Sequence, residues 1–148
     1  MPKAIIIEEF GGPEVMQMID SQALPPNSHE VTIRNMAIGL NFIDTYHRSG
    51  LYPVELPSNL GLEGSAVITD LGKDVDGFNL GDRVAYVGLP IGAYSEQRNY
   101  PANGLVKIPE SISNEQAAAS MLKGLTAWYL ANKSYPIKIG DDVLIYAA

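Results

Sequence analysis

Over its first 110 residues the chain alternates short apolar runs with clusters of glycine, proline and asparagine, a pattern typical of strands joined by turns. Three isoleucines, Ile5–Ile7, precede the turn signal Gly11-Gly12-Pro13, and Val31 alternates with Ile33. The pattern predicts antiparallel strands over residues 3–8, 15–19, 30–38, 64–71, 83–87 and 93–100.

Two later segments have the composition and end signals of helices. Residues 41–49 contain no glycine or proline and are followed by Gly50, a residue type that commonly ends helices in the left-handed conformation. Ser113 and Gln116 have the spacing of a capping box ahead of a helix over residues 117–133.

The last part of the chain departs from the β-rich pattern. Gly124 lies inside the second helical segment and predicts a break there. Residues 143–148 are entirely apolar, which predicts a strand buried on both faces of a parallel sheet. Because no parallel partner precedes it, we expect it to be the first strand of a sheet that continues beyond this chain.

The amino-acid composition excludes several classes of binding partner and active site. The 148 residues are 46% hydrophobic and 18% charged, as in a globular domain, and the net charge of −7 argues against a nucleic-acid or membrane-surface partner. The absence of cysteine excludes disulfides, thiolate metal sites and a cysteine nucleophile, and the two histidines are too few for a His-rich metal site. Without a signal peptide or an apolar membrane-spanning run, the protein is expected in the cytoplasm.

Four stretches resemble one family in order along the chain. They are GLNFIDTYHRSGLYP (Gly39–Pro53), LGLEGSAVI (Leu60–Ile68), FNLGDRVAY (Phe78–Tyr86) and EQAAASMLKGLTAWYL (Glu115–Leu130). The family is the zinc-free, zeta-crystallin-like quinone oxidoreductases of the medium-chain dehydrogenase/reductase superfamily. The resemblance implies an α+β fold, mainly β with helices, in which residues 1–112 form a GroES-like, partly open β-barrel. Residues 113–148 would form a helical connection and the first strand of a Rossmann domain.

The spacing of the glycines argues against a dinucleotide-binding turn within this chain. No two glycines here have the G-x-G spacing, so the chain lacks the dinucleotide-binding turn that cradles a pyrophosphate. We therefore expect this chain to bind no nicotinamide cofactor with useful affinity by itself, and activity to require the longer protein with NADPH. The NADPH preference is implied by the resemblance alone.

The resemblance also bears on zinc. Zinc-dependent relatives carry a G-H-E motif where this sequence has Gly61-Leu62-Glu63, and they carry a cysteine that is missing here. We expect no metal site, since carboxylates alone suit hard cations and not a catalytic zinc.

What remains is direct hydride transfer from NADPH to a quinone, in which a neutral phenol can donate a hydrogen bond to the acceptor oxygen. The resemblance places two sets of residues in the cleft. The substrate-pocket set is Asn41, Asp44, Tyr46 and Tyr52. The cofactor-binding set is Asn41, Phe42, Ile43, Asp44, Thr126 and Tyr129.

Structural interpretations of these residues stay open. Phe42 and Tyr46 have the spacing of core packing, Asn41 that of a helix cap, and Asp44 with Arg48 that of a surface ion pair. Tyr52 precedes a proline and is equally consistent with a loop aromatic. Glu63 is expected to be a buried carboxylate bonded to nearby amides. His47 is a poor candidate for a catalytic residue, because the sequence offers no partner that would orient its ring.

Two other functions stay open beside quinone reduction. Zinc-free relatives also reduce enals or enoyl thioesters, and a GroES-like barrel can act as a binding module without enzymatic activity. The expected partner is a small-molecule quinone, with neither nucleic acid nor membrane. An exposed C-terminal helix and strand also predict self-association.

Overall fold

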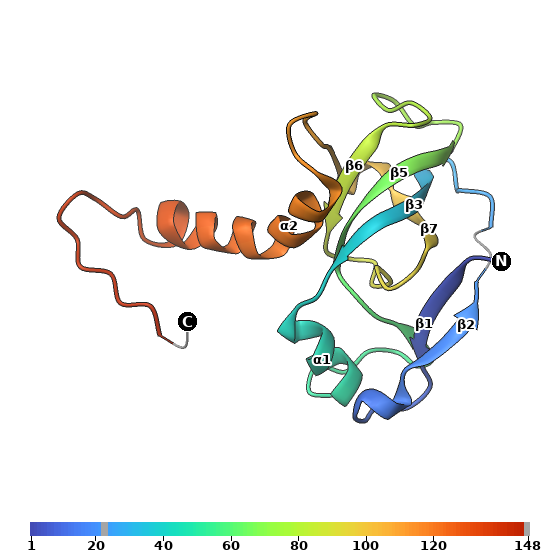
Figure 1. The fold of residues 1–148 in the computed structure, drawn as a ribbon, viewed down its shortest axis with the longest axis horizontal. Coiled ribbons are helices and arrows are strands. Elements are labelled where there is room, and N and C mark those ends of the chain that lie inside the picture. Colours follow the sequence, from blue (N-terminus) through green and yellow to red (C-terminus); the bar gives the residue numbers. More distant parts are fainter. Residues whose placement is uncertain (22–23, 147–148) are drawn as a thin grey trace.

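The computed structural model describes residues 1–21 and 24–146 and consists of two antiparallel sheets and two main helices (Figure 1). The strands are β1 (Lys3–Ile7), β2 (Gln17–Asp20), β3 (Glu30–Gly39), β4 (Ser58–Asn59), β5 (Glu63–Leu71), β6 (Arg83–Val87), β7 (Gln97–Pro101) and β8 (Leu105–Lys107). The helices are α1 (Phe42–Ser49) and α2 (Asn114–Tyr129), and α2 continues as a π-helix over Leu130–Ser134. Short 3-10 helices cover Pro13–Val15 and Ala102–Gly104.

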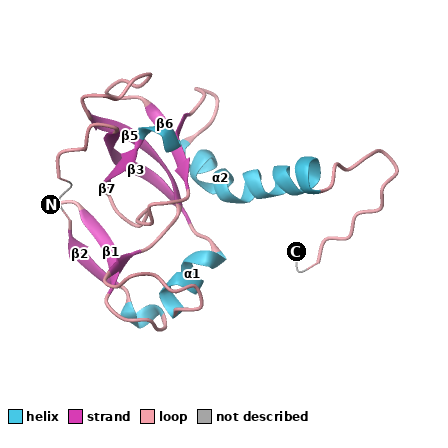
Figure 2. Ribbon diagram, turned by 180° about the vertical axis from the view of Figure 1, so that it is seen from behind, coloured by secondary structure: helices cyan, strands magenta, loops and turns pink. Residues whose placement is uncertain are grey.

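The strands pair in two sheets with the orders β2-β1-β4 and β7-β3-β5-β6-β8. All described pairings are antiparallel, and the long strand β3 lies between β5 and β7. The register of β3 against β5 shifts at two places, where Thr69 of β5 and Met36 of β3 are left unpaired, which marks one β-bulge in each strand. The sheets lie as two neighbouring layers, with α1 at the end of the smaller one (Figure 2).

The larger sheet encloses the main core. Alternating residues point inward, as the period of two requires, and their side chains are nearly or fully buried. The cluster comprises Val31, Ile33, Ala66, Ile68, Val84, Tyr86, Ala93, Tyr100, Ala102 and Leu105. The sequence prediction of a mainly β fold with helices is confirmed.

Most predicted elements form near their expected bounds. Residues 17–20 pair with β1 as the expected hairpin partner, while the strand predicted over 93–100 is shorter and begins at Gln97. Gly50 ends α1 with φ 79°, in the left-handed region that favours glycine. Ser113 and Gln116 form the predicted capping box of α2.

One expectation for the last part of the chain is wrong, and another stays a prediction. Gly124 causes no break, because α2 runs continuously through it. Residues 143–146 form no strand, and the predicted residues Ala147 and Ala148 lie outside the described part of the chain. A strand needs a neighbour for its backbone groups, and residues 143–146 lie apart from both sheets (Figure 1), so the first strand of a further sheet stays a prediction. The boundary after residue 112 stays a prediction.

No helix in the described ranges combines the length and the apolar character that a membrane crossing requires.

Candidate functional site

Helix α1 brings Asn41 and Asp44 together at its first turn. Asn41 is the N-cap residue, and its backbone N–H donates to Oδ2 of Asp44 at 2.9 Å. The Asp44 carboxylate thus satisfies a backbone donor that the helix leaves unpaired. Both residues are buried, with Asp44 only 3% exposed. The helix-cap interpretation of Asn41 is therefore correct: its side-chain oxygen faces the Asp44 backbone N–H in a capping box, and its side-chain NH2 group is left for a second partner.

Asp44 has a further donor from a distant loop. The hydroxyl of Tyr94 donates to the same Oδ2 at 2.8 Å, while Oδ1 is buried without a hydrogen-bond partner in the described structure. Burial, with the Asp44 contact as the next cause, raises the pKa of Tyr94 well above its usual value. Tyr94 is therefore a neutral donor at physiological pH and holds this carboxylate from outside the helix.

The side chain of Asn41 is directed towards strand β5. Its Nδ2 donates to Oε1 of Glu63 at 2.8 Å, and Glu63 is fully buried at 0% exposure. The other oxygen of Glu63, Oε2, accepts the backbone N–H of Leu122 in α2 at 2.6 Å. As expected, Glu63 is a buried carboxylate bonded to amides, and it joins α1 to α2.

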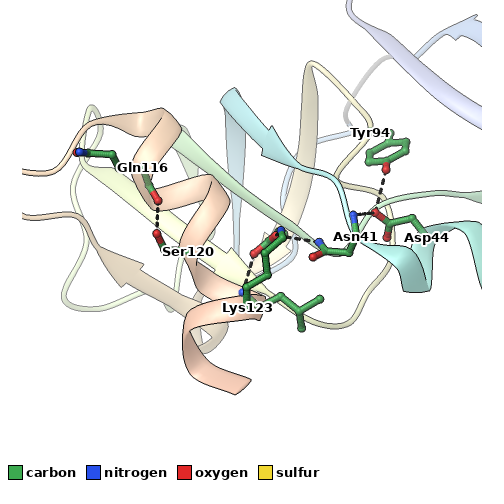
Figure 3. Close-up of polar contacts among 8 residues, drawn as sticks. Asn41, Asp44, Tyr94, Gln116, Ser120 and Lys123 are labelled. Carbon is green, nitrogen blue, oxygen red and sulfur yellow. Dashed lines mark hydrogen bonds and ion pairs between the residues drawn. The ribbon is translucent and has the colours of Figure 1, made fainter. Parts of the chain in front are cut away.

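Lys123 completes this cluster. Its Nζ lies 2.9 Å from Oε1 of Glu63, while more than half of the lysine side chain remains exposed. The ammonium group balances the buried carboxylate, a pairing that burial of a charge generally requires. Figure 3 shows the resulting continuous series of polar contacts, which runs from Tyr94 through Asp44 and Asn41 to Lys123.

Tyr46 of α1 and Tyr52 of the segment that follows it form an aromatic pair. Their ring centroids lie 5.4 Å apart in an edge-to-face arrangement, and the backbone N–H of Tyr52 donates to the Tyr46 carbonyl oxygen. Tyr52 is 52% exposed and Tyr46 is half-buried. Both rings therefore remain in part accessible to a ligand.

The structure separates the remaining predicted residues. Phe42 is 82% exposed, so the core-packing interpretation of this ring is wrong, and Ile43 is half-buried. Thr126 and Tyr129 lie on the exposed C-terminal half of α2, which projects away from the sheets (Figure 1). Thus Asn41, Asp44 and the tyrosine pair gather around α1, while the two α2 residues lie apart.

Two alternatives from the sequence have clear outcomes. Asp44 and Arg48 form no ion pair, since Arg48 Nε donates to the Gly11 carbonyl oxygen instead. His47 is buried, and its Nδ1 has no partner in the described structure.

Sequence reasoning missed Tyr94 and Lys123. Tyr94 lies 50 residues from its partner Asp44, and Lys123 lies 60 residues from Glu63, so no local spacing signals either contact. The one available signal was Lys123 inside the apolar α2 sequence, where an unpaired charge is unfavourable next to a core.

The described residues hold no group of three histidine, aspartate or glutamate side chains arranged to bind a metal ion. Leu62, which stands where the resemblance places a histidine in zinc enzymes, is buried and offers no donor atom.

Comparisons with known proteins agree with this architecture. The profile of the alcohol dehydrogenase GroES-like domain matches residues 27–110. A quinone oxidoreductase of Pseudomonas aeruginosa is 50% identical over 149 residues, covering 100% of this chain and 46% of the relative. A 2-haloacrylate reductase of Burkholderia sp. is 41% identical over 154 residues, again covering 100% of this chain and 46% of the relative.

Among solved structures, Escherichia coli quinone oxidoreductase complexed with NADPH superposes with a TM-score of 0.90 at 47% identity, covering 92% of this chain and 42% of that one. This chain spans a little under half the length of these relatives. The expected resemblance to quinone oxidoreductases is confirmed, and the chain belongs to the alcohol dehydrogenase GroES-like domain family.

Proposed function

We propose that this chain forms the substrate-binding half of an NADPH-dependent quinone oxidoreductase. The observation that carries the proposal is the 50% identity to a quinone oxidoreductase across the whole chain, together with the TM-score of 0.90 to an NADPH complex. The polar cluster and the aromatic pair around α1 support it. The pair offers neutral phenol donors and partly exposed aromatic rings, which suit a planar quinone.

The residues of this chain fit one end of NADPH and not the other. The exposed Phe42 and the accessible tyrosine pair suit a planar nicotinamide, and Thr126 and Tyr129 add hydroxyl groups on the open face of α2. No glycine pair with the G-x-G spacing is present to cradle the pyrophosphate. The nucleotide end therefore requires residues outside this chain, and the isolated chain is expected to bind NADPH poorly.

When bound, NADPH supplies the hydride, and this chain supplies positioning and charge stabilisation. The phenols of Tyr46 and Tyr52 donate hydrogen bonds towards the quinone oxygens, where negative charge develops. Tyr94 holds the Asp44 carboxylate at the first turn of α1, so that the helix start keeps one geometry. No general base is assigned, because the reduced quinone can take its protons from water.

The proposal includes no zinc, and the donor set supports this. Leu62 carries no ligand atom, and the Glu63 carboxylate already accepts hydrogen bonds from three donors.

An activated alkene is the second candidate substrate. It is favoured by one observation, the 41% identity to a 2-haloacrylate reductase. Both reactions deliver hydride to an electron-poor acceptor conjugated to an oxygen, so the same donors would serve either.

The test joins residues 1–148 to the remaining part of the Pseudomonas aeruginosa relative, and we call this the fusion protein. NADPH consumption is measured with a panel of 1,4-quinones, an enal and 2-haloacrylate, with the 148-residue chain alone as the control. Faster turnover of quinones by the fusion protein, with none by the chain alone, is the expected result. Faster turnover of the enal or haloacrylate would replace the proposed substrate. No NADPH consumption with any acceptor would reject the proposed function.

A further inference from the structure

The Glu63 carboxylate accepts hydrogen bonds from three groups that belong to two separate elements beyond its own strand. Asn41 Nδ2 comes from the start of α1, while the Leu122 backbone N–H and the Lys123 ammonium come from α2. The contacts measure 2.8, 2.6 and 2.9 Å, and the carboxylate is fully buried. A group with this connectivity does more than fill space, because it fixes two helices relative to one another.

We propose that Glu63 is a positioning residue, which fixes the Asn41 amide at the start of α1 and holds α2 beside it, so that the two helices meet the nicotinamide in one arrangement. This inference rests on the proposed function. Glu63 itself has no access to a ligand, so it acts only through Asn41 and α2.

The chemistry of the two groups fixes the amide orientation. All partners of Glu63 are donors, so the carboxylate acts only as an acceptor. The Asn41 amide must therefore turn its NH2 group towards Glu63, which leaves its oxygen Oδ1 towards the Asp44 backbone N–H in the capping box of α1. Glu63 therefore fixes the amide that caps α1, and with it the start of the helix that carries Phe42 and Ile43.

Packing prevents the carboxylate from adopting another position. A Cβ atom at Gly39 would overlap the Glu63 carboxylate and approach the Ala118 carbonyl oxygen to 2.5 Å. The absent side chain at Gly39 is thus what allows β3, β5 and α2 to meet around this group. Lys123 reaches it from the exposed side and compensates its charge, in the arrangement drawn in Figure 3.

The test uses Glu63→Gln, which keeps the size of the side chain but gives it only one acceptor oxygen for three donors. Glu110→Gln is the matched control, since it makes the same charge change at an exposed residue. In the fusion protein, Glu63→Gln is expected to raise the KM for NADPH about tenfold, the loss expected for about one hydrogen bond. The KM for the quinone should stay within about twofold.

A double-mutant cycle separates positioning from simple stabilisation. In the Asn41→Ala background, Glu63→Gln is expected to raise the KM for NADPH less than it does alone, because the part of its effect that passes through Asn41 is gone and only the contacts with α2 remain. Additive effects, or a lower kcat at unchanged KM with a lower unfolding midpoint, would show that Glu63 only stabilises the fold.

A second measurement needs neither turnover nor a folded variant. In the ¹⁵N-labelled 148-residue chain, the side-chain NH2 signals of Asn41 are expected to exchange with solvent more slowly than those of exposed asparagines such as Asn103. Equal exchange rates would overturn the proposed amide orientation. A fusion protein that consumes NADPH normally while Glu63→Gln has no effect would reject this inference and leave the proposed function intact. A fusion protein with no NADPH consumption would reject both.

Discussion

The Tyr94 hydroxyl donates a 2.8 Å hydrogen bond to Oδ2 of Asp44, the same oxygen that accepts the Asn41 backbone N–H. The loop that follows β6 is therefore tied to the first turn of α1. The Tyr94 ring also packs against Gly61, where a Cβ atom would overlap it. One aromatic side chain thus connects the loop, the strand entry before β5 and the candidate site.

Tyr94→Phe is expected to lower the free energy of unfolding by about 1–2 kcal/mol, because the Asp44 carboxylate loses one of its two donors in a buried place. The substitution keeps the ring packing, so the loss of stability measures the contribution of the hydroxyl group alone. Urea unfolding measures the change, with Tyr135→Phe as the control at an exposed tyrosine. Equal unfolding free energies for the two variants would contradict the assigned hydrogen bond.

Gly39→Ala is expected to destabilise the protein by about 1–3 kcal/mol, through overpacking at the point where β3 meets Glu63 and Ala118. The matched control is Gly124→Ala in α2, where the nearest atom outside the local helix backbone, Ser120 Cβ, lies 3.9 Å from the new Cβ. That control should gain about 0.5–1 kcal/mol from helix propensity. Thermal and urea unfolding measure both changes. A Gly39→Ala variant as stable as the wild type would refute the close approach.

Signals within a few residues of one another can be read from the sequence, whereas the effect of a glycine such as Gly124 depends on its whole helix. Local signals such as the cap residues Ser113 and Gln116, or Gly50 after α1, determine geometry within a few residues and were identified correctly. Whether Gly124 breaks a helix depends on the balance along the whole of α2, whose other residues favour helix strongly enough to continue through it.

Other features depend on contacts between distant residues and leave no local trace. Residues 143–146 have the composition of a buried strand, yet a strand needs a hydrogen-bonded neighbour. In the same way, Glu63 was expected to be buried, but its partners on α2 follow only from the folded arrangement of β5 beside that helix.

Alkaline pH is expected to destabilise the protein through Tyr86. Burial raises the pKa of this tyrosine to about 12, while the unfolded chain ionises near about 10. Below about pH 10 Tyr86 is protonated in both states, so its ionisation costs no stability. Between about pH 10 and about pH 12 only the unfolded state releases the proton, so the free energy of unfolding falls as the pH rises.

Urea unfolding at neutral pH and at a pH midway between these two values measures this loss. The tyrosinate absorbance of the folded protein should also correspond to fewer than its 8 tyrosines until urea is added. The Tyr86→Phe variant should lose less stability over the same interval. An identical pH dependence for this variant and the wild type would exclude Tyr86 as the cause.

Tyr52 is expected to act on the quinone and not on NADPH. In the fusion protein, Tyr52→Phe should lower kcat/KM for a 1,4-quinone about tenfold, because it removes a donor to the developing oxyanion and keeps the edge-to-face contact with Tyr46. The KM for NADPH should not change. Steady-state kinetics measure both parameters, and Tyr135→Phe serves as a control on an exposed tyrosine outside the site. An unchanged quinone kcat/KM would assign Tyr52 to loop packing alone.

Self-association of the 148-residue chain is expected through residues 135–146. Ile139, Leu144 and Ile145 are almost fully or largely exposed, and the backbone of residues 143–146 belongs to no sheet in the described structure. Pairing of this segment between two copies would bury apolar surface and would also satisfy its backbone hydrogen-bonding groups.

Sedimentation over a range of concentrations should show reversible dimers of the 148-residue chain. Leu144→Lys should weaken dimerisation at least about tenfold, because it places a charge in the buried contact. Leu80→Lys, at an exposed leucine in a turn, should leave association unchanged. A monomer at all concentrations would exclude this contact.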